Sequence, residues 1–207
     1  MQFPLNKQTI HLGSGEISLL VPDEQAVKDA YQQGEIGFPY WSQVWPAAKA
    51  LAQFLLQHPD YTTGKQVLEI GAGLGLPSLV AAANAAAVLC TDHAQEATEV
   101  AKQSAQLNGL SNFQTLVLDW NHLPVELKMD VVLLSDINYE PAAMQTLKEM
   151  IHRFVQNDLT VILSTPQRLM AKEFVASLLS FCKVNKQVTV AHDNQQVAVS
   201  ILVLQKG

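Results

Sequence analysis

The sequence predicts an α/β fold with a doubly wound, mostly parallel sheet of seven strands that ends in an antiparallel hairpin. From Lys65 onward, short apolar segments alternate with longer segments whose apolar residues recur every three or four positions. Such alternation is typical of a parallel sheet with helices on both faces. The last two apolar segments flank Asp193-Asn194, which is a hairpin signal, so the final pair of strands should be antiparallel.

Each element of this sheet has its own signal. Seven apolar segments of strand length are expected at residues 66–70, 87–91, 113–118, 130–135, 159–164, 184–190 and 197–204. Apolar residues recur at helical spacing in five segments, which begin near Pro46, Leu76, Ala97, Pro141 and Pro166. Proline is favoured in the first turn of a helix, so Pro46, Pro141 and Pro166 are each expected to begin one. Asn108-Gly109 should end the third of these helices.

The N-terminal part is less regular. Residues 1–44 should form an extension or lid that consists of a hairpin around residues 13–15 and a short helix from Pro22-Asp23 to Gly34. Residues 45–207 should form the ligand-binding domain. We expect the two parts to make one globular unit, because no linker-like segment separates them.

Composition excludes several classes of protein. Among 207 residues, 48% are hydrophobic and 15% are charged, which is not typical of disorder. The net charge of −6 argues against a dedicated nucleic-acid-binding protein. No leader pattern or membrane-length apolar segment is visible, and Cys90 and Cys182 stand in no C-x-x-C motif. We therefore expect a cytoplasmic protein without a membrane partner, and the histidine spacing predicts no metal.

Three glycines, Gly71, Gly73 and Gly75, lie between the first strand of the sheet and the following helix. Glycine permits positive φ and lets the backbone approach a ligand closely. In open α/β sheets, ligands bind at the carboxyl ends of the strands, where this loop must lie. The pattern predicts a Rossmann-like site for a nucleotide-type ligand, and a plain tight turn is the alternative.

The spacing of these glycines favours S-adenosylmethionine over NAD. The dinucleotide motif places its third glycine three positions after the second, whereas Gly75 follows two positions after, with Leu76 next. Glu69 would repel a pyrophosphate but attract the ammonium group of S-adenosylmethionine. Asp92 ends the second strand 21 residues after Gly71, where a carboxylate can accept both ribose hydroxyls. A helix N-cap is the alternative role for this aspartate.

Four segments, V-L-E-I-G-A-G-L-G-L, C-T-D-H, L-D-W and S-D-I-N-Y, resemble the class I, seven-stranded S-adenosylmethionine-dependent methyltransferases. More narrowly, they are similar to the methyltransferase 16 group of protein lysine methyltransferases, also labelled nicotinamide N-methyltransferase-like. The resemblance covers residues 39–163 and includes an upstream tryptophan. It implies the class I methyltransferase fold, S-adenosyl-L-methionine as cofactor and a monomer.

The resemblance also implies roles for individual residues. Contacts with the cofactor would come from nine positions: Trp45, Glu69, Gly71, Gly73, Gly75, Asp92, Asp119, Trp120 and Ser135. Within this set, Glu69 would lie near the amino group, Asp92 on the ribose and the Asp119-Trp120 pair beside the adenine. Asp136 and Tyr139 would lie next to the transferred methyl group as catalytic residues. One departure from the family pattern is Leu74, where threonine or serine is common.

The motif that contains Asp136 bears on the acceptor. Enzymes that methylate planar amides or base amines resemble one another through N-P-P-Y here, whereas this chain has D-I-N-Y. A charged aspartate suits a flexible, cationic acceptor, so we expect an N-methyltransferase that acts on a protein lysine. A small amine or heteroaromatic acceptor, and a non-catalytic nucleotide-binding module, are the alternatives. Asp136 could instead cap a helix, while Tyr139 and the tryptophans could be packing residues. His93 is expected to be a solvated loop residue.

Overall fold

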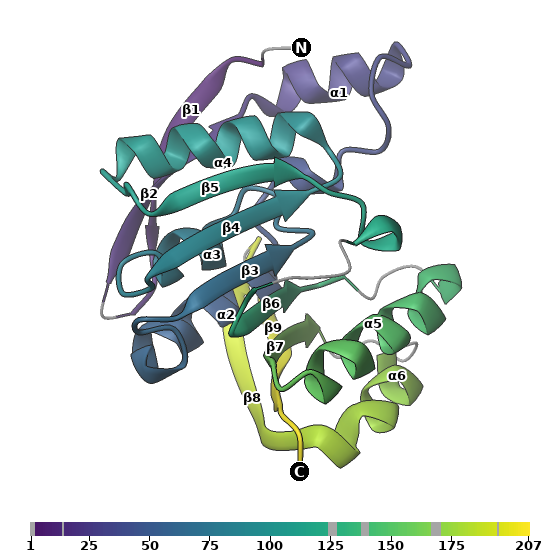
Figure 1. The fold of residues 1–207 in the computed structure, drawn as a ribbon. Coiled ribbons are helices and arrows are strands. Elements are labelled where there is room, and N and C mark those ends of the chain that lie inside the picture. The colour runs from purple at the N-terminus through teal and green to yellow at the C-terminus, as the bar shows by residue number, and fades with distance from the viewer. Residues whose placement is uncertain (1–2, 14, 124–127, 138–140, 167–170, 194) are drawn as a thin grey trace.

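A single seven-stranded sheet organises the protein in the computed structural model, which describes residues 3–13, 15–123, 128–137, 141–166, 171–193 and 195–207. Its strands lie in the order β5-β4-β3-β6-β7-β9-β8 (Figure 1). Their bounds are β3 Gln66–Ile70, β4 Ala87–Asp92, β5 Phe113–Val117, β6 Val131–Ser135, β7 Thr160–Pro166, β8 Cys182–His192 and β9 Gln195–Leu204. Strands β3 to β7 are mutually parallel, and β9 pairs antiparallel with β7 and β8. The predicted fold class is confirmed.

The centre and the edges of the sheet differ in burial as the sequence pattern requires. Strands β3 and β6 are buried on both faces over residues 67–70 and 131–134, so they appear in the sequence as mainly apolar segments, with Glu69 as the one charged residue in β3. The edge strand β8 alternates between exposed and less exposed side chains along most of its length. The fully buried centre of the sheet therefore leads directly into the glycine loop.

Helices cover both faces of the sheet (Figure 1). Helices α2 (Pro46–Gln57), α3 (Leu76–Ala81) and α4 (Gln95–Leu107) pack on one face. Helices α5 (Met144–Gln156) and α6 (Ala171–Leu178) lie on the other, with α5 over the alternate residues of β3 and β6. Each layer has its own apolar core, which is the arrangement of a doubly wound sheet.

Two helix starts differ from the expectation. Pro141 begins a short 3-10 turn, Pro141–Ala143, and α5 follows from Met144. Pro166 is the last residue of β7 rather than the first of a helix. The last pairing of β7 with β6 is at Ser164, so Pro166 has no β6 neighbour to which it would donate, and its missing N–H is tolerated there.

The N-terminal segment forms the expected hairpin and short helix. Strands β1 (Leu5–His11) and β2 (Glu16–Pro22) make a separate two-stranded sheet, and α1 spans Glu24–Gln32. The hairpin packs on the outer side of α4 through side-chain bonds to the β2 backbone. The backbone N–H of Leu20 donates to Ser104 Oγ at 3.0 Å, and Asn108 Nδ2 donates to the Ser18 carbonyl at 2.6 Å. Leu19 is fully buried in the same contact.

Candidate functional site

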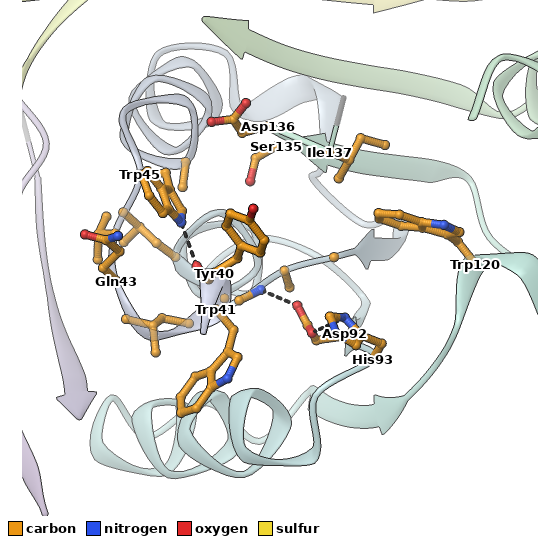
Figure 2. Close-up of a pocket in the computed structure, with 18 residues that line it drawn as sticks. Tyr40, Trp41, Gln43, Trp45, Asp92, His93, Trp120, Ser135, Asp136 and Ile137 are labelled. Atoms are coloured by element: carbon orange, nitrogen blue, oxygen red, sulfur yellow. Dashed lines mark hydrogen bonds and ion pairs between the residues drawn. The ribbon is translucent and has the colours of Figure 1, made fainter. Parts of the chain in front are cut away.

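A pocket opens at the carboxyl ends of β3, β4 and β6, where the sequence places the glycine loop (Figure 2). It encloses about 810 Å³ of empty space, including the part open to solvent. A 3-10 helix, η1 (Tyr40–Ser42), and the start of α2 close it from the other side. Residues on both sides of position 44 therefore line the pocket, so the expected division between extension and domain passes through its wall.

The glycine loop has a backbone that other residues would strain. Gly71, Gly73 and Gly75 have φ of 64°, 53° and 74°. A Cβ on Gly73 would lie 3.3 Å from the carbonyl oxygen of Trp41, across the pocket wall. A Cβ on Gly75 would lie 3.0 Å from Cys90 Sγ, beneath the loop. The loop therefore forms a bare backbone surface that lines the pocket and fits tightly on both sides.

Asp92 fixes this loop to the end of β4. Its buried carboxylate accepts the Gly73 N–H through Oδ2 at 2.8 Å and the Ala94 N–H through Oδ1 at 2.9 Å. His93 Nδ1 lies 3.2 Å from the same Oδ1. A carboxylate can accept about four hydrogen bonds, so these contacts leave capacity for ligand hydroxyls. Asp92 thus combines a turn-stabilising role with a place in the pocket wall.

Aromatic side chains form much of the remaining wall. Trp45 donates from Nε1 to the Tyr40 carbonyl at 2.7 Å, which fixes its indole at the start of α2. Trp41 is buried against the loop and belongs to an apolar cluster, as expected for a core residue, yet it also lines the pocket. In Figure 2, Trp120 stands across the pocket from Tyr40 and Trp45. These rings come from segments about 75 residues apart in the sequence.

Ser135, the last residue of β6, and Asp136, the residue after it, both line the pocket. Asp136 is buried and has φ of 53°, and its backbone N–H donates to the Ser164 carbonyl at 2.9 Å. A positive φ in a non-glycine residue costs of order 1–2 kcal/mol and is concentrated at functional sites. Tyr139, the other expected catalytic residue, lies outside the described residues.

Two of the residues expected to contact the cofactor, Glu69 and Asp119, lie outside the pocket wall. Glu69 is fully buried beneath the loop, where Oε2 accepts the Ser78 N–H at 2.9 Å, and it does not line the pocket. Burial raises the pKa of Glu69 from 4.5 to about 8, against the opposing effect of hydrogen bonds from Ser78. The expected attraction between an ionised Glu69 and an ammonium group therefore has no counterpart in this geometry. Asp119 is outside the pocket wall and largely exposed, and the hydrogen bond from the Asn121 N–H lowers its pKa.

The structure thus brings eight of the eleven expected site residues to one pocket: Trp45, Gly71, Gly73, Gly75, Asp92, Trp120, Ser135 and Asp136. It adds residues that the sequence did not assign to the cofactor, among them Tyr40, Gln43 and Ile137. His93 is mostly exposed, as expected, but stands at the rim of the pocket. The aromatic segment before Pro46 was the available signal for Tyr40, while nothing in the sequence singles out Gln43.

The described residues contain no group of three or more His, Cys, Asp or Glu side chains that could hold a metal ion. No helix within the same ranges has the length and apolar character needed to cross a membrane.

Comparison with known protein families shows to which family this chain belongs. Residues 29–181 match the sequence profile of a family described as lysine methyltransferase. The chain belongs to this family. The match includes every described residue of the glycine loop and of strands β3 to β7. It ends before β8.

Individual relatives agree with this assignment. The chain is 37% identical over 115 residues to the histone-arginine methyltransferase METTL23 of Homo sapiens, covering 53% of this chain and 60% of the relative. It is 33% identical over 121 residues to the electron transfer flavoprotein beta subunit lysine methyltransferase of Rattus norvegicus, covering 58% of this chain and 45% of the relative. The matched region thus spans about half the length of these curated relatives.

Solved structures confirm the fold. A 16S rRNA methyltransferase (RsmC) of T. thermophilus, in complex with AdoMet and guanosine, superposes with a TM-score of 0.67 at 16% identity, covering 98% of this chain and 51% of that chain. The N-methyltransferase NodS of Bradyrhizobium japonicum, in complex with S-adenosyl-L-homocysteine, gives 0.62 at 13% identity, covering 86% of this chain and 98% of that one. At such identities the likeness shows the class I methyltransferase fold alone.

Proposed function

We propose that this protein is an S-adenosylmethionine-dependent N-methyltransferase that methylates a lysine side chain of a protein. The observation that carries the proposal is the union of the glycine loop, Asp92 and Asp136 in one pocket of a chain from the lysine methyltransferase family. The loop would hold the methionine part of the cofactor and Asp92 the ribose. Trp120 and Ser135 would contact the adenosyl part, and Trp45 would cover the sulfonium region.

The charges around the pocket support a cationic ligand. Asp92 and Asp136 are both in the wall, and none of the described residues that line it is a lysine or arginine. A dinucleotide would place its pyrophosphate against two carboxylates without a compensating cation. The sulfonium and ammonium groups of S-adenosylmethionine carry the complementary charge. Gly73 has little room for a side chain beside Trp41, so the loop presents bare backbone in the wall. Such a surface allows a ligand to lie close to the main chain.

The chemistry of the cofactor leaves the protein with a limited task. When bound, S-adenosylmethionine supplies an activated methyl group on its sulfonium. The chain must then position the acceptor nitrogen, exclude water and favour the neutral amine, because only that form attacks. Asp136, buried at the end of β6, would hold the incoming ammonium group and orient it as it loses its proton. Tyr139 would contact the same amine from the undescribed segment that follows.

The choice of a protein lysine rests on the family and on Asp136. One of the two relatives is an arginine methyltransferase and the other a lysine methyltransferase, so the acceptor side chain needs a direct assay. A small amine remains the alternative acceptor. A monomeric state and a cytoplasmic location stay predictions from the sequence.

Labelled cofactor tests the proposal. The protein is incubated with methyl-labelled S-adenosylmethionine and a cell lysate, and the products are separated into protein and small molecules. We expect label in a protein band that yields methyl-lysine after acid hydrolysis. Methylarginine, or label in small molecules alone, would contradict the acceptor assignment.

A matched variant separates binding from turnover. Asp136→Asn keeps the size of the side chain, and asparagine tolerates the positive φ. At saturating cofactor it should transfer methyl groups at least tenfold more slowly, whereas the loss of one wall charge should weaken cofactor binding less than that. Unchanged turnover in this variant would remove Asp136 from the proposed acceptor site.

A further inference from the structure

The C-terminal hairpin extends beyond the rest of the sheet at the edge that carries the pocket. Strand β8 is antiparallel to β9, and β9 is antiparallel to β7, so β8 runs in the direction of the parallel strands. The last pair between β7 and β9 is Pro166 with Val199, but β9 begins four residues earlier, at Gln195. At about 3.3 Å per residue, the hairpin projects roughly 13 Å past β7. It does so on the side of the glycine loop.

His192, at the projecting end of β8, contacts a residue of the pocket wall. Val188 and Val190 of β8 pack on the core formed with α2, and His192 continues the same row by the period of two. Its ring centroid lies 6.4 Å from that of Trp45, with an interplanar angle of 36°. The side chain of His192 is only 20% exposed. The hairpin end is therefore packed against a residue of the pocket wall.

Asp193 adds a carboxylate at the same place. Its Oδ2 lies 3.3 Å from His192 Nε2, and its side chain is 86% exposed. This carboxylate therefore lies beside the histidine whose ring contacts Trp45. Both residues lie beyond residue 181, where the match to the family ends.

We infer that the end of β8, with His192 and Asp193, forms the outer wall of the acceptor channel, where Asp193, positioned by His192, attracts a cationic side chain of the substrate. The inference rests on the proposed function and adds a specificity residue to it. A cationic acceptor would meet the Asp193 carboxylate first, pass the Trp45 ring and end at Asp136. Trp45 can also bind a cation over its face, so the three groups make a continuous path for positive charge.

The chain offers a matched control for Asp193. Asp158 is another exposed aspartate with positive φ, 64° against 46° for Asp193, and 74% of its side chain is exposed. It follows α5, at the end of the sheet opposite the pocket, and neutralising it changes the net charge equally. Asparagine tolerates positive φ at both positions. A difference between the two variants therefore reports position rather than net charge.

Fluorescence anisotropy with a fluorescein-labelled octalysine peptide, in the presence of S-adenosylhomocysteine, measures the effect. Asp193→Asn should weaken octalysine binding about two- to fivefold, the range of an exposed ion pair, and Asp158→Asn should not. His192→Phe keeps a ring on Trp45 but loses the nitrogen that faces Asp193, so it should weaken binding as well. His192→Gln supplies an amide nitrogen at a similar reach and should restore the affinity.

Three results would overturn the inference. They are equal affinities of Asp193→Asn and Asp158→Asn, equal loss in His192→Phe and His192→Gln, and a wild-type protein that binds octalysine no better than octaglutamate. Calorimetry with S-adenosylhomocysteine tests the proposed function separately. Normal binding of this compound in all four variants, together with any of these three results, would reject the hairpin wall and leave the proposed function in place.

Discussion

Replacing Glu69 by glutamine should stabilise the protein at neutral pH, because the buried carboxyl group resists ionisation. The side chain is fully buried, and its Oε1 has no hydrogen-bond partner among the described residues. Burial raises the pKa of Glu69 from 4.5 to about 8. The folded state thus keeps a proton that the unfolded state releases between these pH values, so the free energy of unfolding falls as the pH rises through this window.

The magnitude follows from the width of the window. Each pH unit above 4.5 lowers the free energy of unfolding by about 1.4 kcal/mol, which amounts to about 3 kcal/mol at pH 7. Glutamine keeps a carbonyl oxygen for the Ser78 N–H and has no proton to lose. Glu69→Gln should therefore match the wild type near pH 4.5 and exceed it by about 2–4 kcal/mol at pH 7.

Urea unfolding followed by circular dichroism at pH 5, 6, 7 and 8 measures this difference. Glu149→Gln on α5 is the control, since it neutralises an exposed carboxylate and should leave the pH dependence unchanged. A constant difference between Glu69→Gln and the wild type across this range would refute the reasoning. So would a variant that is less stable at every pH, because the folded protein would then require the ionised carboxylate.

Two further substitutions test the packing around the site. Gly75→Ala should cost about 2–5 kcal/mol in urea unfolding, because its φ of 74° is strained for alanine and the Cβ would meet Cys90 Sγ at 3.0 Å. Gly64→Ala, with φ of 68° and nothing within 4 Å, should cost only about 1–2 kcal/mol, and equal costs would exclude the contact as a cause. Asn108→Ala should lose about 1–3 kcal/mol and speed amide hydrogen exchange in β1 and β2, and unchanged exchange would show that this residue does not hold the hairpin.

The fold could be predicted because its signals are local. Parallel strands leave short, mainly apolar segments, and helices leave apolar residues at a spacing of three to four, so the sequence predicts all seven strands of the sheet. Pro166 shows the limit of such signals. Proline suits both the first turn of a helix and a strand end that lacks a neighbour, and only the pairing of β7 with β6 decides between them.

The sequence predicts those site residues that lie at the carboxyl ends of the strands. Asp92 and Asp136 reach the pocket because Asp92 is the last residue of β4 and Asp136 directly follows β6 at the same sheet edge. Glu69 does not, since a side chain inside a strand points to a sheet face, and alternation from Val67 directs it under α3. His192 reaches Trp45 through packing between segments that are distant in the sequence, which no local pattern encodes.

Titration calorimetry with S-adenosylmethionine tests the central claim most directly. We expect a dissociation constant of micromolar order, about −8 kcal/mol, and no measurable heat with NAD. Asp92→Asn should weaken the binding by about 1–3 kcal/mol, as for a lost hydrogen bond to a charged group. A wild-type protein that binds NAD, or that gives no heat with S-adenosylmethionine, would contradict the claim that this pocket holds a methyl donor.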